Sequence, residues 1–280
     1  MKTKFNKRIL WMMAAILTLC GAVMFSSCSK DDDNGNGSVN EMNVKEKIIG
    51  KWMPADKDGQ PMITNKKMSI TFTSPTKAYM SASLNAHPEA GSFWTIRLDG
   101  DVVINNDKVV VTAKASENEV VLHEYIINDI NDKELTANHR VTYTVDGKVE
   151  LFIEDVVRYV KQTADYKQDI IGLWECTGLS GIETYNDANA RLEFATDGTY
   201  KYWQKNDFNV WNAVTTREFQ NYFVDGTLLA TRWKDQGDAE LREWWEIESI
   251  TNDEMTWKAL RQNEEGENVV QRMTWKKVDS

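Results

Sequence analysis

The side chains that most often carry chemistry are few in this chain and widely spaced. The histidines are His87, His123 and His139, and none pairs with a second histidine or a cysteine at a zinc-ligand spacing. Segment 164–280 has no histidine and a single thiol, Cys176, which excludes Ser–His and Cys–His nucleophile systems there. We therefore expect no metal, no cofactor and no enzymatic activity.

Carboxylates are abundant, but they lack the pattern of a site. Glu243, Glu246 and Glu248 would serve a glycosidase only if two of them faced each other across a cleft. Asp31-Asp32-Asp33 lacks the spaced ligands of a calcium loop, and no glycine-rich loop is built to hold phosphate. These groups indicate a solvated acidic surface, and a hydrolase is the alternative.

Length and charge limit the possible partners. The chain has 280 residues, 41% of them hydrophobic, which is enough for two modest cores. Its formal charge is −10, and it becomes −14 without the four basic residues of segment 1–27. Because so acidic a surface repels phosphate, we expect it to bind neither nucleic acid nor an anionic bilayer.

The start of the chain has the layout of a bacterial secretory signal. A basic stretch, Lys2–Arg8, precedes the apolar run Ile9–Phe25, and two serines lead to Cys28. Phe-Ser-Ser-Cys resembles the lipobox of bacterial lipoproteins, which implies that residues 1–27 are removed and that Cys28 carries the lipid anchor. The alternative is a retained membrane helix, since 17 apolar residues are near the minimum for spanning ~30 Å.

Residues 28–43 read as a flexible acidic tether, because Ser29–Ser38 contains charged residues, Gly and Asn but no apolar residue and so cannot support a packed core. The run Ser29–Asp33 resembles the surface-export signal of Bacteroidota lipoproteins. That resemblance implies a position on the outer face of the outer membrane, and a periplasm-facing protein is the alternative. With Cys20 removed and Cys28 lipidated, Cys176 has no disulfide partner.

The rest of the chain contains one pattern twice. Ile48-Ile49-Gly50-Lys51-Trp52 returns as Ile170-Ile171-Gly172-Leu173-Trp174, 122 residues later. In the first copy, Asn43 is a candidate N-cap for a short helix before the motif. We therefore divide the chain into a first module, 44–163, and a second module, 164–280.

Each motif is followed by alternating apolar segments separated by turns. The matching segments and turns are Ile70–Phe72 with Leu192–Phe194, Ser74–Thr76 with Thr196–Gly198, Leu98–Gly100 with Val224–Gly226, and Asp146-Gly147 with Glu265-Gly266. Seven or eight short strands per module predict an all-β protein with two tandem small antiparallel up-and-down barrels, and sandwiches are the alternative.

This order of features resembles the small lipocalin-like domains of Bacteroidota lipoproteins, over about 230 of the 280 residues. In lipocalins the tryptophan of Gly-x-Trp packs over the closed end of the barrel. The resemblance therefore implies structural roles for Gly50, Trp52, Gly172 and Trp174, and it implies binding of a small apolar ligand.

Tryptophan is concentrated in the second module, which holds eight of the 11. A filled aromatic core is one explanation, and a ligand-binding wall is the other. Since Trp244 and Trp245 alternate along one strand, one of them should lie outside the core or at a mouth. As candidate ligand-binding residues we select six aromatic side chains: Tyr200, Tyr202, Trp203, Trp211, Trp245 and Trp257.

Together these features predict a lipid-anchored cell-envelope protein that binds a small apolar molecule without catalysis, with the second module as the ligand site. One alternative is recognition of a glycan or protein by exposed aromatic loops, as an accessory of a surface uptake system. The other is a structural role with filled barrels.

Overall fold

The computed structural model describes residues 41–55, 67–83, 96–181, 189–214, 218–234, 240–262 and 265–278. The predicted signal, Cys28, His87 and Trp94 lie outside them. No helix within the described ranges is long and apolar enough to cross a membrane.

The described elements are α2 (Glu41–Lys47), β1 (Gly50–Pro54), β2 (Lys67–Ser74), β3 (Lys77–Ser83), β4 (Ile96–Asn105), β5 (Lys108–Lys114), β6 (Glu119–Ile130), β7 (Glu134–Val145), β8 (Lys148–Gln162), β9 (Gly172–Ser180), β10 (Ala190–Phe194), β11 (Tyr200–Lys205), β12 (Trp211–Ala213), β13 (Glu218–Asp225), β14 (Leu228–Lys234), β15 (Glu240–Ile250), β16 (Glu254–Gln262) and β17 (Asn268–Val278).

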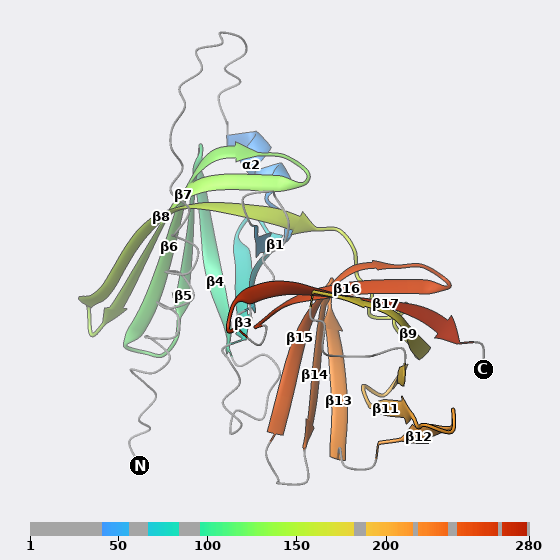
Figure 1. Cartoon of the computed structure of the whole chain (residues 1–280). Coiled ribbons are helices and arrows are strands. Elements are labelled where there is room, and N and C mark those ends of the chain that lie inside the picture. Colours follow the sequence, from blue (N-terminus) through green and yellow to red (C-terminus); the bar gives the residue numbers. More distant parts are fainter. Residues whose placement is uncertain are drawn as a thin grey trace. The chain divides into compact units, whose positions relative to one another are not determined.

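The chain divides into two compact units between Gln162 and Thr163. In the first unit, β1 to β8 pair in sequence order, and β8 returns to β1 to close an antiparallel barrel (Figure 1). The predicted all-β, antiparallel up-and-down class is confirmed.

The second unit is a curled nine-stranded sheet in the order β12-β11-β10-β9-β17-β16-β15-β14-β13 (Figure 1). We expected a closed barrel, but within the described residues a single bridge, Thr199 to Asn221, joins its two ends. β12 has three residues, and the register of β13 on β14 shifts between Glu218 and Asn221. A short strand beside an irregular one cannot continue the ladder.

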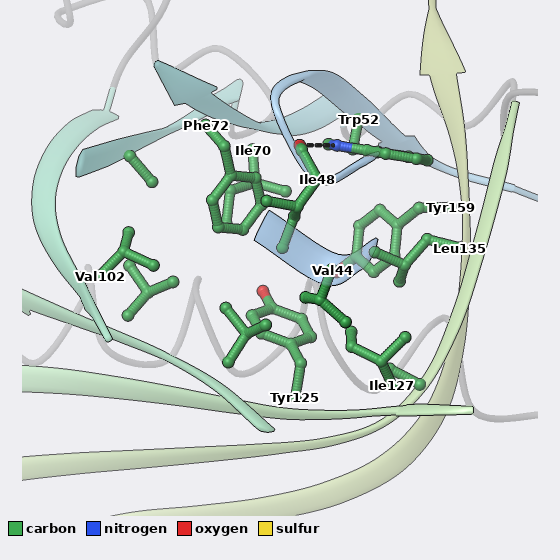
Figure 2. Close-up of a cluster of buried hydrophobic side chains, with 14 of the residues drawn as sticks. Val44, Ile48, Trp52, Ile70, Phe72, Val102, Tyr125, Ile127, Leu135 and Tyr159 are labelled. Carbon is green, nitrogen blue, oxygen red and sulfur yellow. Dashed lines mark hydrogen bonds between the residues drawn. The ribbon is translucent and has the colours of Figure 1, made fainter. Parts of the chain in front are cut away.

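In the first unit the core lies inside the barrel. Val44 and Ile48, which come from the helical segment, pack with strand residues such as Trp52, Phe72 and Tyr125 (Figure 2). The predicted short helix is present, but it begins at Glu41, so Asn43 lies within it and does not cap it. Glu41 pairs with Lys45 one turn later, which supports the earlier start.

The core of the second unit is aromatic. Trp257 lies 4.8 Å from Trp275 and 5.4 Å from Trp245 between ring centroids, and Phe194 packs edge-on against Tyr222. These five side chains are each at most 8% exposed. Aromatic rings therefore fill the concave side of this sheet.

One predicted hairpin is wrong. Asp99-Gly100 lies inside β4, and the turn follows at Asn106, whose φ is 55°. Gly100 pairs with Ala113, and a Cβ on Gly100 would lie 2.8 Å from Val111 Cγ1. The glycine at this position permits close packing and makes no turn. By contrast, Gly147, Gly198, Gly226 and Gly266 have positive φ at the turns where we expected them.

Candidate functional site

Each unit has the same arrangement around its Gly-x-Trp tryptophan. In the first unit, the indole Nε1 of Trp52 donates to the carbonyl oxygen of Ile48 at 2.6 Å (Figure 2). The Lys161 ammonium lies 5.1 Å from the Trp52 ring centroid and donates to the Lys47 carbonyl oxygen at 2.8 Å. Burial lowers the pKa of Lys161, and Asp132 partly offsets this. We call this pair of side chains, a tryptophan covered by the lysine opposite it, the Trp–Lys cap.

In the second unit the cap consists of Trp174 and Lys277. The indole of Trp174 donates to the Ile170 carbonyl oxygen at 2.7 Å, and the Lys277 ammonium again lies 5.1 Å from the ring. Both tryptophans are fully buried, and Gly50 and Gly172 have φ values of 127° and 131°. The tryptophan of each cap therefore offers no exposed surface to a ligand.

Four of the six predicted ligand-binding residues face the concave side of the second sheet. Tyr200, Trp245 and Trp257 are buried there, and Tyr202 is half-buried. Arg261 lies at the margin of this core with its guanidinium 4.4 Å from the Trp245 ring centroid, and the Trp245 indole donates to Glu243 at 3.3 Å. Burial lowers the pKa of Arg261. These side chains contact each other, so the predicted wall is largely packed core.

The other two candidates, Trp203 and Trp211, lie on the opposite face. Trp203 pairs across the strands with Arg191, and the Arg191 guanidinium lies 4.1 Å from the Trp211 ring centroid. Arg191 also forms an ion pair with Glu175. Trp211 is therefore held against the sheet by a cation that is itself fixed.

The hairpin between Trp203 and Trp211 exposes hydrophobic side chains, whereas the two tryptophans themselves are half-buried. Phe208 is 86% exposed, and Phe219 at the start of β13 is 68% exposed. The Asn206 side chain accepts hydrogen bonds from the backbone of Phe208 and Val210, both at 3.0 Å, which shapes this tip.

Trp245 belongs to the buried core cluster of the second unit and Trp244 does not, as strand alternation predicted. Both are buried, at 7% and 6% exposure, although they lie on opposite faces of β15. Trp244 packs edge-on against Phe223, with centroids 6.0 Å apart. Strand alternation correctly separates the two rings, but it does not show that both faces are covered here.

The first barrel contains a polar row that the sequence analysis did not anticipate. His123 on β6 and His139 on β7 are both 2% exposed, and His123 Nδ1 lies 3.0 Å from His139 Nε2. The two ring planes differ by 13°, and the ring centroids are 5.2 Å apart. The two nitrogens therefore meet edge to edge, within the planes of both rings. That is the geometry of an N–H···N hydrogen bond between two neutral imidazoles.

The surroundings keep this pair neutral. Burial lowers the pKa of His123 to about 4, and burial together with His123 lowers the pKa of His139. The Tyr125 ring stacks on His139 at 4.2 Å with an interplanar angle of 2°. Burial also raises the pKa of Tyr125, against the effect of its hydrogen bond with Tyr159.

The paired nitrogens are too close for a shared metal ion on the line between them. An ion midway would be about 1.5 Å from each, inside the ~2.0 Å of a Zn–N bond. Among the described residues, no group of three or more His, Cys, Asp or Glu side chains is arranged to hold a metal.

Asp155 extends the row onto β8. It is the cross-strand partner of His139, and cross-strand partners share a face of the sheet. The alternation of β8 agrees, because Ile153 and Val157 on either side of it belong to the interior clusters. Asp155 is half-buried and accepts a hydrogen bond from the Val156 amide at 2.7 Å.

Apolar side chains surround the barrel end beyond this row. Val121, Val141 and Tyr143 are buried there, whereas Leu98, Val145, Leu151 and Ile153 pack against them but remain half-buried. At the other end, the inward-facing residues of β8, Val157 and Tyr159, are buried. We call this end of the barrel, where the inward-facing side chains keep accessible surface, the mouth.

Alternation is the signal that could have identified these residues from the sequence. Val121, His123, Tyr125 and Ile127 occupy every second position, which already places His123 among inward-facing apolar residues. His139 lies in an equivalent pattern on the next strand. Sequence spacing alone made the two histidines look unrelated, because they meet only across the β6–β7 pairing.

No family model matches the chain, and no curated protein matches its sequence. Three solved structures are distantly similar. A protein of unknown function from Nostoc punctiforme is 10% identical with a TM-score of 0.24, covering 85% of this chain and 99% of that one. A double mutant of the vaccine antigen transferrin-binding protein B from Haemophilus parasuis is 11% identical with a TM-score of 0.23, covering 83% of this chain and 59% of that one. A proposed outer membrane protein from Bacteroides fragilis is 12% identical with a TM-score of 0.22, covering 84% and 99%. At these scores we transfer no property of these proteins to this chain.

Proposed function

We propose that this protein is a lipid-anchored, non-enzymatic binding protein of the bacterial cell envelope that holds a small, largely apolar molecule in the mouth of its first barrel. The observation that supports this is the half-buried apolar lining of an inward-facing surface, formed by Leu98, Leu151 and Ile153. If the protein needed only a filled core, burying these side chains completely would increase its stability.

This proposal moves the ligand site from the second module to the first. The aromatic residues that favoured the second module, such as Trp245 and Trp257, pack on one another in a buried core. The first barrel has fewer large rings at its mouth and a closed wall of eight strands. Ligand pockets typically combine such an apolar lining with a few polar groups.

The cellular location rests on the sequence. The signal-like segment before Cys28 and the acidic run Asp31-Asp32-Asp33 after it support a lipid anchor in the outer membrane with the protein at the cell surface. A periplasm-facing orientation is the alternative for the same anchor.

The test is to identify by mass spectrometry what co-purifies with the full chain and with two variants. Ile153→Trp places a large ring in the mouth, and it should abolish capture. Phe152→Trp changes the neighbouring side chain, which is 57% exposed on the outer face, and it should capture as the unchanged protein does. Equal capture by both variants, or no capture by the unchanged chain, would contradict binding in this barrel.

A second candidate function is supported by the exposed rings of the second unit. Phe208 and Phe219 are exposed on the described surface, and exposed aromatic side chains are suited to stacking on sugar rings or to protein contact. Under this proposal the second unit would recognise a glycan or a protein for a surface uptake system. A glycan-array screen of the full chain tests it.

A further inference from the structure

Strand β8 closes the first barrel with only part of its length. Its last residues, Tyr159–Gln162, pair with β1, and the Ala55 amide donates to the Arg158 carbonyl oxygen at 2.9 Å. Segment 148–157 pairs with β7 on one side, and no strand of the described ranges pairs with it on the other. This half of β8 is therefore an edge of the sheet.

The backbone of this edge is directed to the open side at every second residue. The Arg158 carbonyl points toward β1, and the register of β8 on β7 does not shift from there back to Leu151. Because backbone groups alternate between the two sides of an antiparallel strand, Phe152, Glu154 and Val156 direct their N–H and C=O groups away from β7. These three residues can therefore pair with a further strand.

The contacts and exposure of these residues support an available edge. The Val156 amide donates to the Asp155 carboxylate at 2.7 Å, a side-chain contact in place of a bond between strands. The side chains of Phe152 and Val156 are 57% and 54% exposed on the outer face. Open backbone groups beside exposed apolar side chains form a template on which a further strand can add.

The outer face also indicates which charge an added strand should carry. Lys108 on β5 pairs with Glu124 on β6, and Glu124 lies opposite Arg140 on β7. Arg140 in turn pairs with Glu154 on β8 at 3.1 Å. The signs alternate along this row, and the row ends at the edge with a carboxylate. Since opposite charges on neighbouring strands attract and like charges repel, the next strand should place a cation opposite Glu154.

We infer that this edge of β8 binds an extended segment of another protein by strand addition. The segment carries a basic residue opposite Glu154, with apolar residues two positions before and after it, opposite Phe152 and Val156. Its backbone pairs with the N–H and C=O groups of the same three residues. This inference goes beyond the proposed function, because the edge lies in the wall of the barrel and needs no molecule in the mouth.

A second copy of this chain is less suited to the edge. In antiparallel pairing, Phe152 opposite a second Phe152 brings Glu154 opposite Glu150. Phe152 opposite Val156 instead brings the two Glu154 side chains together. Both registers that match apolar side chains therefore place like charges face to face, which disfavours them. A segment with a central cation avoids this repulsion.

Two short synthetic peptides test the inference on the full chain in neutral detergent, with affinities measured by NMR titration. One is acetyl-Thr-Val-Thr-Lys-Thr-Val-Thr-amide, and the other has Glu in place of Lys. We expect the Lys peptide to bind about five- to tenfold more tightly, because only it places opposite charges across the strands. Glu154→Lys should reverse this order.

Asp129→Lys is the matched control. It makes the same change of charge at an exposed position of β6, which is not the edge strand. It should leave the Lys peptide as the tighter binder. Circular dichroism confirms that both variants are folded.

Amide hydrogen exchange distinguishes strand addition from attraction to the surface. With the Lys peptide bound, the amides of Phe152 and Glu154 should exchange several times more slowly. The amide of Ile153, which faces β7 already, should be unchanged. Equal slowing at all three positions would show that the peptide stabilises the barrel without pairing with its edge.

The other results also decide the question. If neither peptide binds, or both bind equally, the edge does not recognise a strand of this pattern. If Asp129→Lys reverses the order as Glu154→Lys does, the peptide responds only to the net charge of the chain. If the peptide-free chain dimerises on sedimentation and Phe152→Ser abolishes the dimer, the occupant of the edge is a second copy.

Discussion

The indole of Trp174 donates a hydrogen bond to the carbonyl oxygen of Ile170 at 2.7 Å, and the corresponding bond from Trp52 to Ile48 is 2.6 Å. In both cases the acceptor lies four residues before the ring. The backbone that enters the first strand is thus tied to a buried ring. The tryptophan side chain thus has three roles: it donates a hydrogen bond to a backbone carbonyl, it fills part of the core, and its ring packs against a lysine.

Replacing Trp174 by Ala should destabilise the second unit by ~3–5 kcal/mol, because it removes a fully buried ring from a packed core. Trp174→Phe keeps most of the ring and loses the bond to Ile170, so it should cost less. Chemical denaturation followed by circular dichroism measures both. A loss below ~1 kcal/mol for Trp174→Ala would contradict a structural role for the cap.

Replacing Gly172 by Ala should cost about 1–3 kcal/mol, because φ is 131°, a conformation that other residues rarely adopt. The new Cβ would also lie 3.0 Å from Lys277 Cε. Gly178→Ala in the same strand is the control, since its Cβ would make an ordinary 3.7 Å contact with Thr274 and its φ is not positive. Equal losses at both sites would show that backbone conformation is not the reason.

The first unit should lose stability in mild acid. The pKa of His123 falls from 6.5 to about 4 on folding, so between these values the unfolded chain binds more protons than the folded one. Stability is therefore complete above about pH 6.5 and decreases as the pH falls toward 4, by roughly 3 kcal/mol for this residue. Hydrogen exchange of β6 and β7 amides should show the loss.

The second unit, which has no histidine, provides the internal control for this pH effect, through the amides of β16 and β17. A variant with His123→Gln and His139→Gln should lack the acid sensitivity of β6 and β7. If exchange in those strands is as acid-sensitive in the variant as in the unchanged chain, the buried imidazoles are not its source.

Replacing Cys28 by Ala should release the protein from membranes, because the lipid would have no attachment point. Phase separation in detergent, followed by immunoblotting, measures the distribution. Cys20→Ala serves as the control and should leave the protein in the membrane fraction. Retention of the Cys28→Ala chain would show instead that segment 9–25 spans the bilayer.

Replacing Phe208 by Ser should change stability by less than ~0.5 kcal/mol, because the ring is 86% exposed and packs against little. If the second unit recognises glycans through its exposed rings, the same change should abolish signals on a glycan array. Tyr222→Phe is not a suitable comparison, since its hydroxyl donates to the Ala195 carbonyl inside the unit. An array signal that survives Phe208→Ser would exclude this hairpin as the contact surface.

Repetition and alternation predicted the local features well. Gly50 and Gly172, chosen because the motif occurs twice, have nearly the same φ, and the tryptophans two residues later make equivalent contacts. Such features depend on residues that are close in sequence, so a sequence pattern can predict them. Asp99-Gly100 misled us because glycine serves both tight turns and close strand contacts, and only the neighbouring strand distinguishes them.

Features that depend on long-range pairing were not predictable. The meeting of His123 with His139 depends on a register shift between Ile127 and Asp129, which changes the partners along the rest of β6. The open end of the second sheet depends on where β13 leaves its neighbour. No single residue type marks either event, and the aromatic composition of the second unit did not show that most of its rings pack on one another.

The last strand of each unit lies beside the first, since β8 pairs with β1 and β17 with β9. Neither unit can therefore complete its fold until its last strand, β8 or β17, has been synthesised, and Trp174 is covered only once β17 is in place. Even a short truncation at the carboxyl terminus that removes Lys277 would leave that indole uncovered. A chain that lacks β17 would therefore expose aromatic surface that the complete sheet hides.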